Sequence, residues 1–97
     1  MNQIICDAIR NKRLLSFNYH GHPRTVEPHT YGIDTKGHLA LRAFQVSGSS
    51  SRGGIPDWRI FHESDILGLS ILESTFANAR SGYVHGDSAF STIQCQL

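Results

Sequence analysis

The sequence predicts a mainly β domain with one N-terminal helix, folded as a small, partly open β-barrel against which the helix packs. Three observations predict this fold: a helical period near the N-terminus, alternation of apolar and polar residues from residue 14 onward, and turn signals between five or six short apolar runs. The chain has 97 residues, which suits one domain with a single core. We therefore expect one domain over 1–97, with a helix at about 2–12, a barrel at about 14–72 and a C-terminal extension at 73–97.

The N-terminal segment has an apolar face with helical spacing, made by Ile4, Ile5, Ala8 and Ile9. Asn2 precedes this run and is a suitable N-cap. The cationic residues Arg10, Lys12 and Arg13 follow, where positive charge suits the negative end of a helix dipole. These features predict a helix over about 2–12.

From residue 14 the period changes to two, because Leu15, Phe17 and Tyr19 alternate with polar residues. Residues 21–23 predict a turn, and 24–31 predict a second extended segment. Pro28 lies inside that segment and cannot donate a ladder hydrogen bond, so it indicates either an edge position or a bulge. A turn at 34–37 precedes a third strand at 38–46, whose two faces carry Leu41 and Arg42 respectively.

The second half of the chain is less regular. Residues 47–57 are rich in serine and glycine and predict a loop, whereas 58–61 and 66–72 read as strands. Residues 73–86 have no clear period. Over 90–97, Ile93, Cys95 and Leu97 alternate with polar residues, which favours a final strand over a helix.

Composition narrows the classes of function. The net charge is +1 with neutral histidines, so nucleic-acid binding would need a local positive patch. No apolar run approaches the length of a membrane helix, and the N-terminus does not resemble a signal peptide. Without such a signal, Cys6 and Cys95 are expected to be reduced thiols in a cytoplasmic protein. The alternative is a bridge that joins the two ends of the chain.

The sequence does not favour a reaction centre. His20 and His22 flank a turn glycine and His29 follows nearby, but the alternation of a strand does not bring these imidazoles to one point, so solvated turn histidines are expected rather than a metal site. Cys6 lies among apolar neighbours, where a thiolate is disfavoured. No motif for nucleophilic catalysis or for a nucleotide-binding loop is present. We expect no enzyme activity, no cofactor and no metal.

Arginine and aromatic residues alternate along the predicted strands. Arginine binds phosphate or carboxylate through a two-point fork and also stacks on flat rings. Aromatic rings on an open barrel face can stack against the bases of single-stranded nucleic acid. The pattern therefore indicates a surface for an anionic or planar partner, although burial of the same rings in the core is the simpler alternative. The residues concerned are Tyr19, Arg24, Arg42, Phe44, Trp58 and Arg59.

Residues 5–76 resemble a WYL domain, a small Sm-like or SH3-like barrel of bacterial transcription regulators and defence-associated proteins. The resemblance includes the first helix, a strand that ends at Tyr19, and closing strands around Arg59 and Ile66. Its clearest parts are Arg24-Thr25-Val26-Glu27-Pro28, which matches the Arg-x-Val-x-Pro stretch of the family, and Leu41-Arg42-Ala43-Phe44, where the Leu of the family name stands. Leu39 and Ala40 replace the eponymous Trp and Tyr, and Asp65 replaces a basic residue.

The resemblance implies a non-catalytic regulatory module that senses an anionic ligand, either a nucleotide or single-stranded nucleic acid. Tyr19, Arg24 and Arg59 match the family's ligand surface by position, while Arg42 and His62 could supply the charge lost elsewhere. With His29, whose charge changes near neutral pH, they predict a ligand groove. Such domains are often dimeric, so we expect a homodimer. They are also usually joined to a DNA-binding winged helix, so we expect that this domain acts alone, that its DNA-reading half lies on another chain, or that this half has been removed. The alternative function is a protein–protein interaction or oligomerisation module, because Arg, Tyr and Trp are also common interface anchors.

Overall fold

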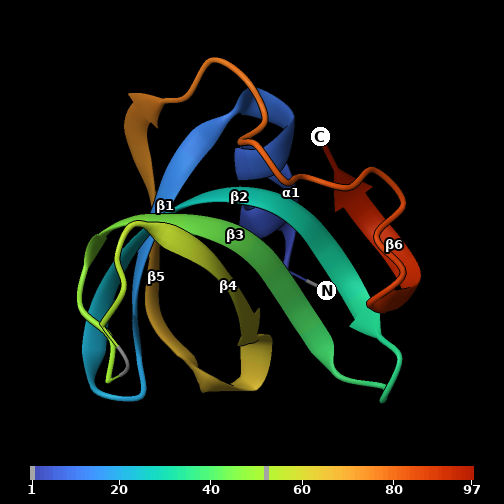
Figure 1. Ribbon diagram of the computed structural model, residues 1–97, viewed down its shortest axis with the longest axis horizontal. Helices are drawn as coiled ribbons and strands as arrows, with labels where there is room; N and C mark the ends of the chain where they lie inside the picture. The colour runs from blue at the N-terminus through green and yellow to red at the C-terminus, as the bar shows by residue number, and fades with distance from the viewer. Residues whose placement is uncertain (1, 52) are drawn as a thin grey trace.

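The computed structural model describes residues 2–51 and 53–97. It is mainly β, with one N-terminal helix and an antiparallel sheet of six strands, which confirms this part of the predicted fold class (Figure 1). In chain order the elements are α1 Gln3–Asn11, β1 Arg13–Tyr19, β2 His22–Asp34, β3 Leu39–Gly48, β4 Asp57–His62, the 3₁₀ turn η1 Glu63–Asp65, β5 Ile66–Thr75 and β6 Phe90–Gln96.

Helix α1 begins and ends as the sequence predicts. The Asn2 side chain accepts a hydrogen bond from the Ile4 main-chain N–H at 3.0 Å, and Lys12 takes the left-handed conformation that ends the helix. Ile5 and Ile9 are buried in the core, whereas Ile4 is 43% exposed because it lies at the margin of the apolar face. No helix in the described part of the chain is long and apolar enough to cross a membrane.

The sheet is organised around β2. Its strand order is β4-β3-β2-β1-β5, and β6 pairs with β2. The first half of β2 pairs with β1 as far as Val26, and its second half pairs with β6 from Thr30 onward. Pro28 lies between these two partners, and the register with β3 shifts between Pro28 and Thr30. Of the two alternatives that Pro28 indicated, an edge position or a bulge, the structure has a local irregularity of the bulge type, and at this position the missing N–H of proline costs little pairing.

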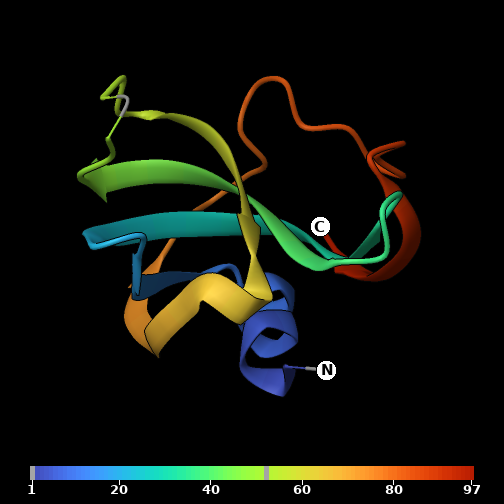
Figure 2. The ribbon, with the colours of Figure 1, turned by 90° about the horizontal axis from the view of Figure 1, so that it is seen from below.

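The sheet curves strongly but is not closed. The short turn η1 joins β4 to β5, which are the two outermost strands of the order, so the sheet must bend to bring these edges near each other (Figure 2). The concave side holds the core, in which Phe17 and Phe61 meet edge to face with ring centroids 5.0 Å apart. Leu41 faces this core and Arg42 faces the other way, as the alternation in the third strand predicts.

Residues 76–89, named here the crossing segment, pack on the outer face of β2, β3 and β4. In Figure 2 this segment and α1 lie on opposite sides of the sheet. The Trp58 indole N–H donates to the Ser81 carbonyl at 2.9 Å, and the Arg80 guanidinium lies 4.7 Å from the centroid of the Phe44 ring. The segment lacks helix and strand, as expected for most of 73–86, but 73–75 belong to β5, which is longer than predicted; the strand predicted after the segment is confirmed as β6.

Cys6 and Cys95 form a disulfide, with Cα atoms 5.7 Å apart. The prediction of two reduced thiols is therefore wrong for this structure, and the alternative of a bridge between the chain ends holds. The physical reason is the pairing of β6 with β2, which brings Cys95 against the helix face that carries Cys6. A sequence separation of 89 residues gives no local signal of such a contact.

Candidate anion-binding site

The six residues expected in one ligand groove lie in three separate places. Tyr19, Arg24 and Arg59 line one pocket at an end of the curved sheet. His29 and Arg42 lie on the outer face, beneath the crossing segment. His62 lies at the end of β4 beside an aspartate and a second histidine.

The pocket, named here the Arg24–Arg59 pocket, has a volume of about 220 Å³. The end of β1, the beginning of β2, β4 and the loop after β3 all contribute to it. Arg59 faces the same side as Phe61 because strand residues two apart share a face. The lining residues are Tyr19, His20, Arg24, Ser50, Ser51, Arg59, Ile60 and Phe61.

Arg24 is held firmly in the wall of this pocket. The residue is only 6% exposed. Its guanidinium donates to the Gln45 side-chain oxygen and to the Tyr19 carbonyl, both at 3.1 Å. It also lies 5.5 Å from the Tyr19 ring centroid and 5.6 Å from that of Phe61. Such cation–π contacts strengthen when the cation is removed from water, so the charge is preorganised.

Arg59 links the pocket to the loop after β3. Its guanidinium donates to the Gly53 carbonyl at 2.6 Å and to the Trp58 carbonyl at 2.9 Å. Its side chain is 9% exposed, whereas that of its carboxylate partner Asp57 is 61% exposed. Among the described residues, no hydrogen-bond partner reaches the buried Arg59 Nε. Within the part of the chain that the structure describes, the carboxylate that pairs with this guanidinium is solvated and the other acceptors are neutral carbonyls, so the arginine keeps charge that can stabilise an incoming anion.

None of the described residues that line the pocket is acidic. His20, on the rim, pairs with Asp65 at 3.2 Å and stacks on Tyr19 with centroids 4.1 Å apart. The Tyr19 hydroxyl accepts the His62 main-chain N–H at 3.0 Å. Tyr19 therefore forms a wall of the pocket, and its ring already stacks within the chain.

His29 is fully buried and does not face the pocket. Its Nδ1–H donates to the Glu27 carbonyl at 2.8 Å, and its Nε2 accepts the Arg80 main-chain N–H at 3.1 Å. Burial lowers the pKa of His29 below its ordinary value. The ring lies 4.7 Å from Trp58 and 5.5 Å from Phe76, so it anchors the crossing segment instead of tuning the charge of a groove.

Arg42 also contacts the crossing segment. It pairs with Asp87 at 3.1 Å beside a cavity of about 290 Å³ that Trp58 and Tyr83 also line. The Asp87 carboxylate offsets the charge of Arg42, so this cavity is less suited to an anion than the Arg24–Arg59 pocket.

A second ion pair lies on the outer face and was not expected from the sequence. Arg80 binds both carboxylate oxygens of Glu27, at 2.7 and 2.9 Å. The Glu27 hydrogen bond is the main cause that raises the pKa of Arg80. Glu27 stands in the Arg-x-Val-x-Pro stretch, but its partner lies 53 residues later in an irregular segment that gives no periodic signal.

The predicted turn histidines do not form a metal site. His20 pairs with Asp65, His22 bonds to Ser49, and His29 is buried elsewhere. In the described part of the chain, the group that could hold a metal is instead Asp34, His38 and His62. Comparisons with models of protein families, with curated proteins and with solved structures found no match to this chain.

Proposed function

We propose that this protein is a non-catalytic binding module that senses an anionic ligand in the Arg24–Arg59 pocket. The observation that carries the proposal is the presence of two largely buried guanidinium groups in one pocket, with no acidic side chain among its described lining residues. Guanidinium groups bind phosphate and carboxylate through charge-assisted hydrogen bonds.

The size of the pocket limits how much of the ligand enters it. Its volume of about 220 Å³ is below the roughly 300 Å³ at which pockets for drug-sized molecules begin. The pocket suits one phosphate group, while the rest of a nucleotide or of a single-stranded nucleic acid lies against the rim near Ser50 and Ser51. Ligands of this class are the ones that the resemblance to WYL domains implies.

The wider role follows the same resemblance. We propose an Sm-like or SH3-like barrel of the WYL kind, acting in bacterial transcription regulation or in the control of a defence system. The strand order, with a short 3₁₀ turn between the two outer strands, supports the barrel assignment. A cytoplasmic homodimer and a DNA-binding partner chain are part of this proposal.

Fluorescence anisotropy with a labelled single-stranded oligonucleotide, in DNA and RNA forms, tests the proposal. Arg59→Ala should weaken binding at least about tenfold, since a hydrogen bond to a charged group is worth about 1.5–3 kcal/mol. It should also reduce the slope of affinity against salt by about one unit. Arg24→Ala should act in the same direction, and unlabelled ATP should compete for the site.

The matched control is Arg42→Ala, which removes the same side chain from the outer face. It should leave binding unchanged, because Arg42 is paired with Asp87 outside the pocket. A wild-type affinity that does not change with salt would refute the phosphate contact. An equal loss of binding in Arg42→Ala would place the ligand elsewhere.

The second candidate function is an oligomerisation or protein-interaction module. Its support is the pair of outer strands β4 and β5, which carry the exposed apolar residues Ile60 (40% exposed) and Leu67 (67% exposed). Trp58, the expected interface anchor, is instead engaged by Ser81 and Phe44 within the chain. Light scattering of Leu67→Lys separates the two functions: loss of a dimer with oligonucleotide binding intact would favour this candidate.

A further inference from the structure

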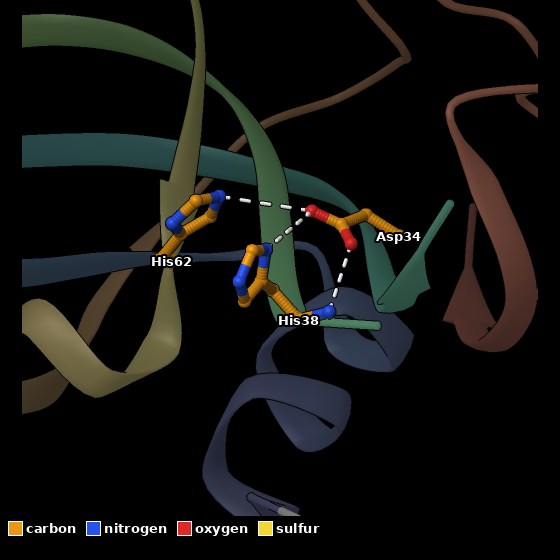
Figure 3. A group of neighbouring side chains, drawn as sticks. All are labelled: Asp34, His38 and His62. Atoms are coloured by element: carbon orange, nitrogen blue, oxygen red, sulfur yellow. Dashed lines mark hydrogen bonds and ion pairs between the residues drawn. The ribbon is translucent and has the colours of Figure 1, made fainter. Parts of the chain in front are cut away.

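Three metal-ligating side chains converge at one corner of the sheet, as Figure 3 shows. Asp34 Oδ2 lies 3.5 Å from His38 Nδ1 and 3.6 Å from His62 Nε2. The three ligand atoms all lie within 4.8 Å of one another. The two imidazole rings are tilted by 33° with centroids 4.7 Å apart, so both present a nitrogen to the same carboxylate oxygen.

The fold places these residues together from three separate segments. Asp34 ends β2, His38 immediately precedes β3, and His62 ends β4. His62 pairs with Ala40 across the β3–β4 ladder, which sets it beside the β2–β3 turn. The turn also orients the carboxylate, because Asp34 Oδ1 accepts the main-chain N–H groups of Lys36 at 2.9 Å and of His38 at 2.8 Å. Oδ2 is left facing the two imidazoles.

The spacing fits metal ligation better than direct hydrogen bonding. Good N–H···O hydrogen bonds in proteins span roughly 2.7–3.2 Å, and both Asp34–histidine distances exceed this range. Ligand atoms about 2.0–2.2 Å from a tetrahedral ion are separated by roughly 3.3–3.6 Å. The two measured distances are close to that separation, and two imidazole nitrogens with one carboxylate oxygen are a familiar ligand set for zinc.

We propose that Asp34, His38 and His62 bind one Zn²⁺ ion, with a fourth coordination position open to water or to a small exogenous ligand. The site is accessible, because the side chains of His38 and His62 are 54% and 42% exposed. A cavity of about 350 Å³, lined in part by His38 and Glu63, adjoins it. Bound metal would tie the β2–β3 turn to the end of β4. This inference does not rest on the proposed anion binding, since neither Arg24 nor Arg59 takes part.

Isothermal titration of the full chain with Zn²⁺ tests the site, together with visible absorption of the Co²⁺-substituted protein. We expect one equivalent to bind, tetrahedral Co²⁺ bands to appear, and Zn²⁺ to raise the thermal midpoint. His38→Ala and His62→Ala should each weaken binding by at least about tenfold, because even loss of an outer-shell partner commonly costs 10–100-fold. Both replaced side chains are about half exposed and neither belongs to the hydrophobic core, so the variants should fold.

The matched controls are His20→Ala and His22→Ala, which remove one exposed and one half-buried histidine outside the cluster. They should bind Zn²⁺ as the unmodified chain does. The proposal is overturned if the chain binds no Zn²⁺ up to millimolar concentration, if His38→Ala and His62→Ala bind unchanged, or if the control variants lose binding instead. Imidazole NMR signals of the unmodified chain give an independent answer, because only those of His38 and His62 should move on addition of one equivalent.

Discussion

Reduction of the disulfide between Cys6 and Cys95 should lower the free energy of unfolding by several kcal/mol while leaving the folded arrangement intact. The bridge joins α1 to β6. In the folded protein β6 is also held by its pairing with β2, from Thr30↔Gln96 to Asp34↔Phe90. The main effect of reduction is therefore on the unfolded chain, which gains freedom when its ends are released.

The size of the effect follows from the length of the closed loop. The two cysteines are separated by 89 residues, for which the chain-entropy relation gives about 4.6 kcal/mol at room temperature. Since small domains commonly have only about 5–15 kcal/mol of stability, this is a large fraction of the total. The proposed cytoplasmic location therefore requires the reduced form to remain folded, because cytosolic thiols are kept reduced.

Urea unfolding, followed by tryptophan fluorescence with and without a thiol reductant, measures the difference. With a dependence of about 1–3 kcal/mol per molar urea, the midpoint should fall by roughly 1.5 M or more on reduction. The matched control is Cys6→Ser, which should unfold like the reduced protein and should not respond to reductant. Coincident midpoints for the oxidised and reduced protein would refute the loop-closure reasoning.

Two further predictions concern the outer face. Arg80→Ala should destabilise the protein by about 1–3 kcal/mol, because it leaves the buried Glu27 carboxylate (7% exposed) without its partner; the loss is smaller than for a fully buried pair, since Arg80 itself is 45% exposed. Chemical denaturation measures this loss, and Arg80→Lys should recover part of it. The control is Arg10→Ala, which breaks the exposed pair with Asp7 and should have almost no effect. Because the pKa of His29 is lowered in the folded protein, the unfolded chain binds the proton more readily. The free energy of unfolding should therefore be constant above the ordinary histidine pKa of about 6.5 and should decrease as the pH drops below it, by at most about 1.4 kcal/mol per pH unit. Denaturation between pH 7.5 and 5 should show a smaller decline in His29→Gln than in the control His22→Gln, and an equal decline in both would contradict the buried neutral imidazole.

Local patterns in the sequence predict most of the strands, because alternation and turn residues report which face of each strand is buried. Pro28 is a particular example: its missing donor indicates an edge or a bulge, and the structure has a register shift of the bulge type directly after it. The crossing segment could not be predicted in the same way. Its attachment depends on long-range pairs such as Arg80 with Glu27, and neither partner has a periodic pattern that identifies the other.

The candidate sites likewise combine residues that a local pattern identifies with contacts that only the folded chain brings together. Tyr19, Arg24 and Arg59 meet in one pocket because the end of β1 and the beginning of β2 adjoin β4 around the core, as a curved sheet requires. His29 stands in a stretch that looks like a binding surface, yet the crossing segment buries it. Asp34 and His38 are four residues apart in a turn, and only the β3–β4 register brings His62 to them.

The disulfide has a practical consequence for attaching this protein to other molecules. It ties helix α1 to strand β6, and Figures 1 and 2 both show these two elements far from the loop between β3 and β4. A tag, a fluorophore or a sensor surface coupled at either end would leave the loop and its neighbouring arginines facing the solution.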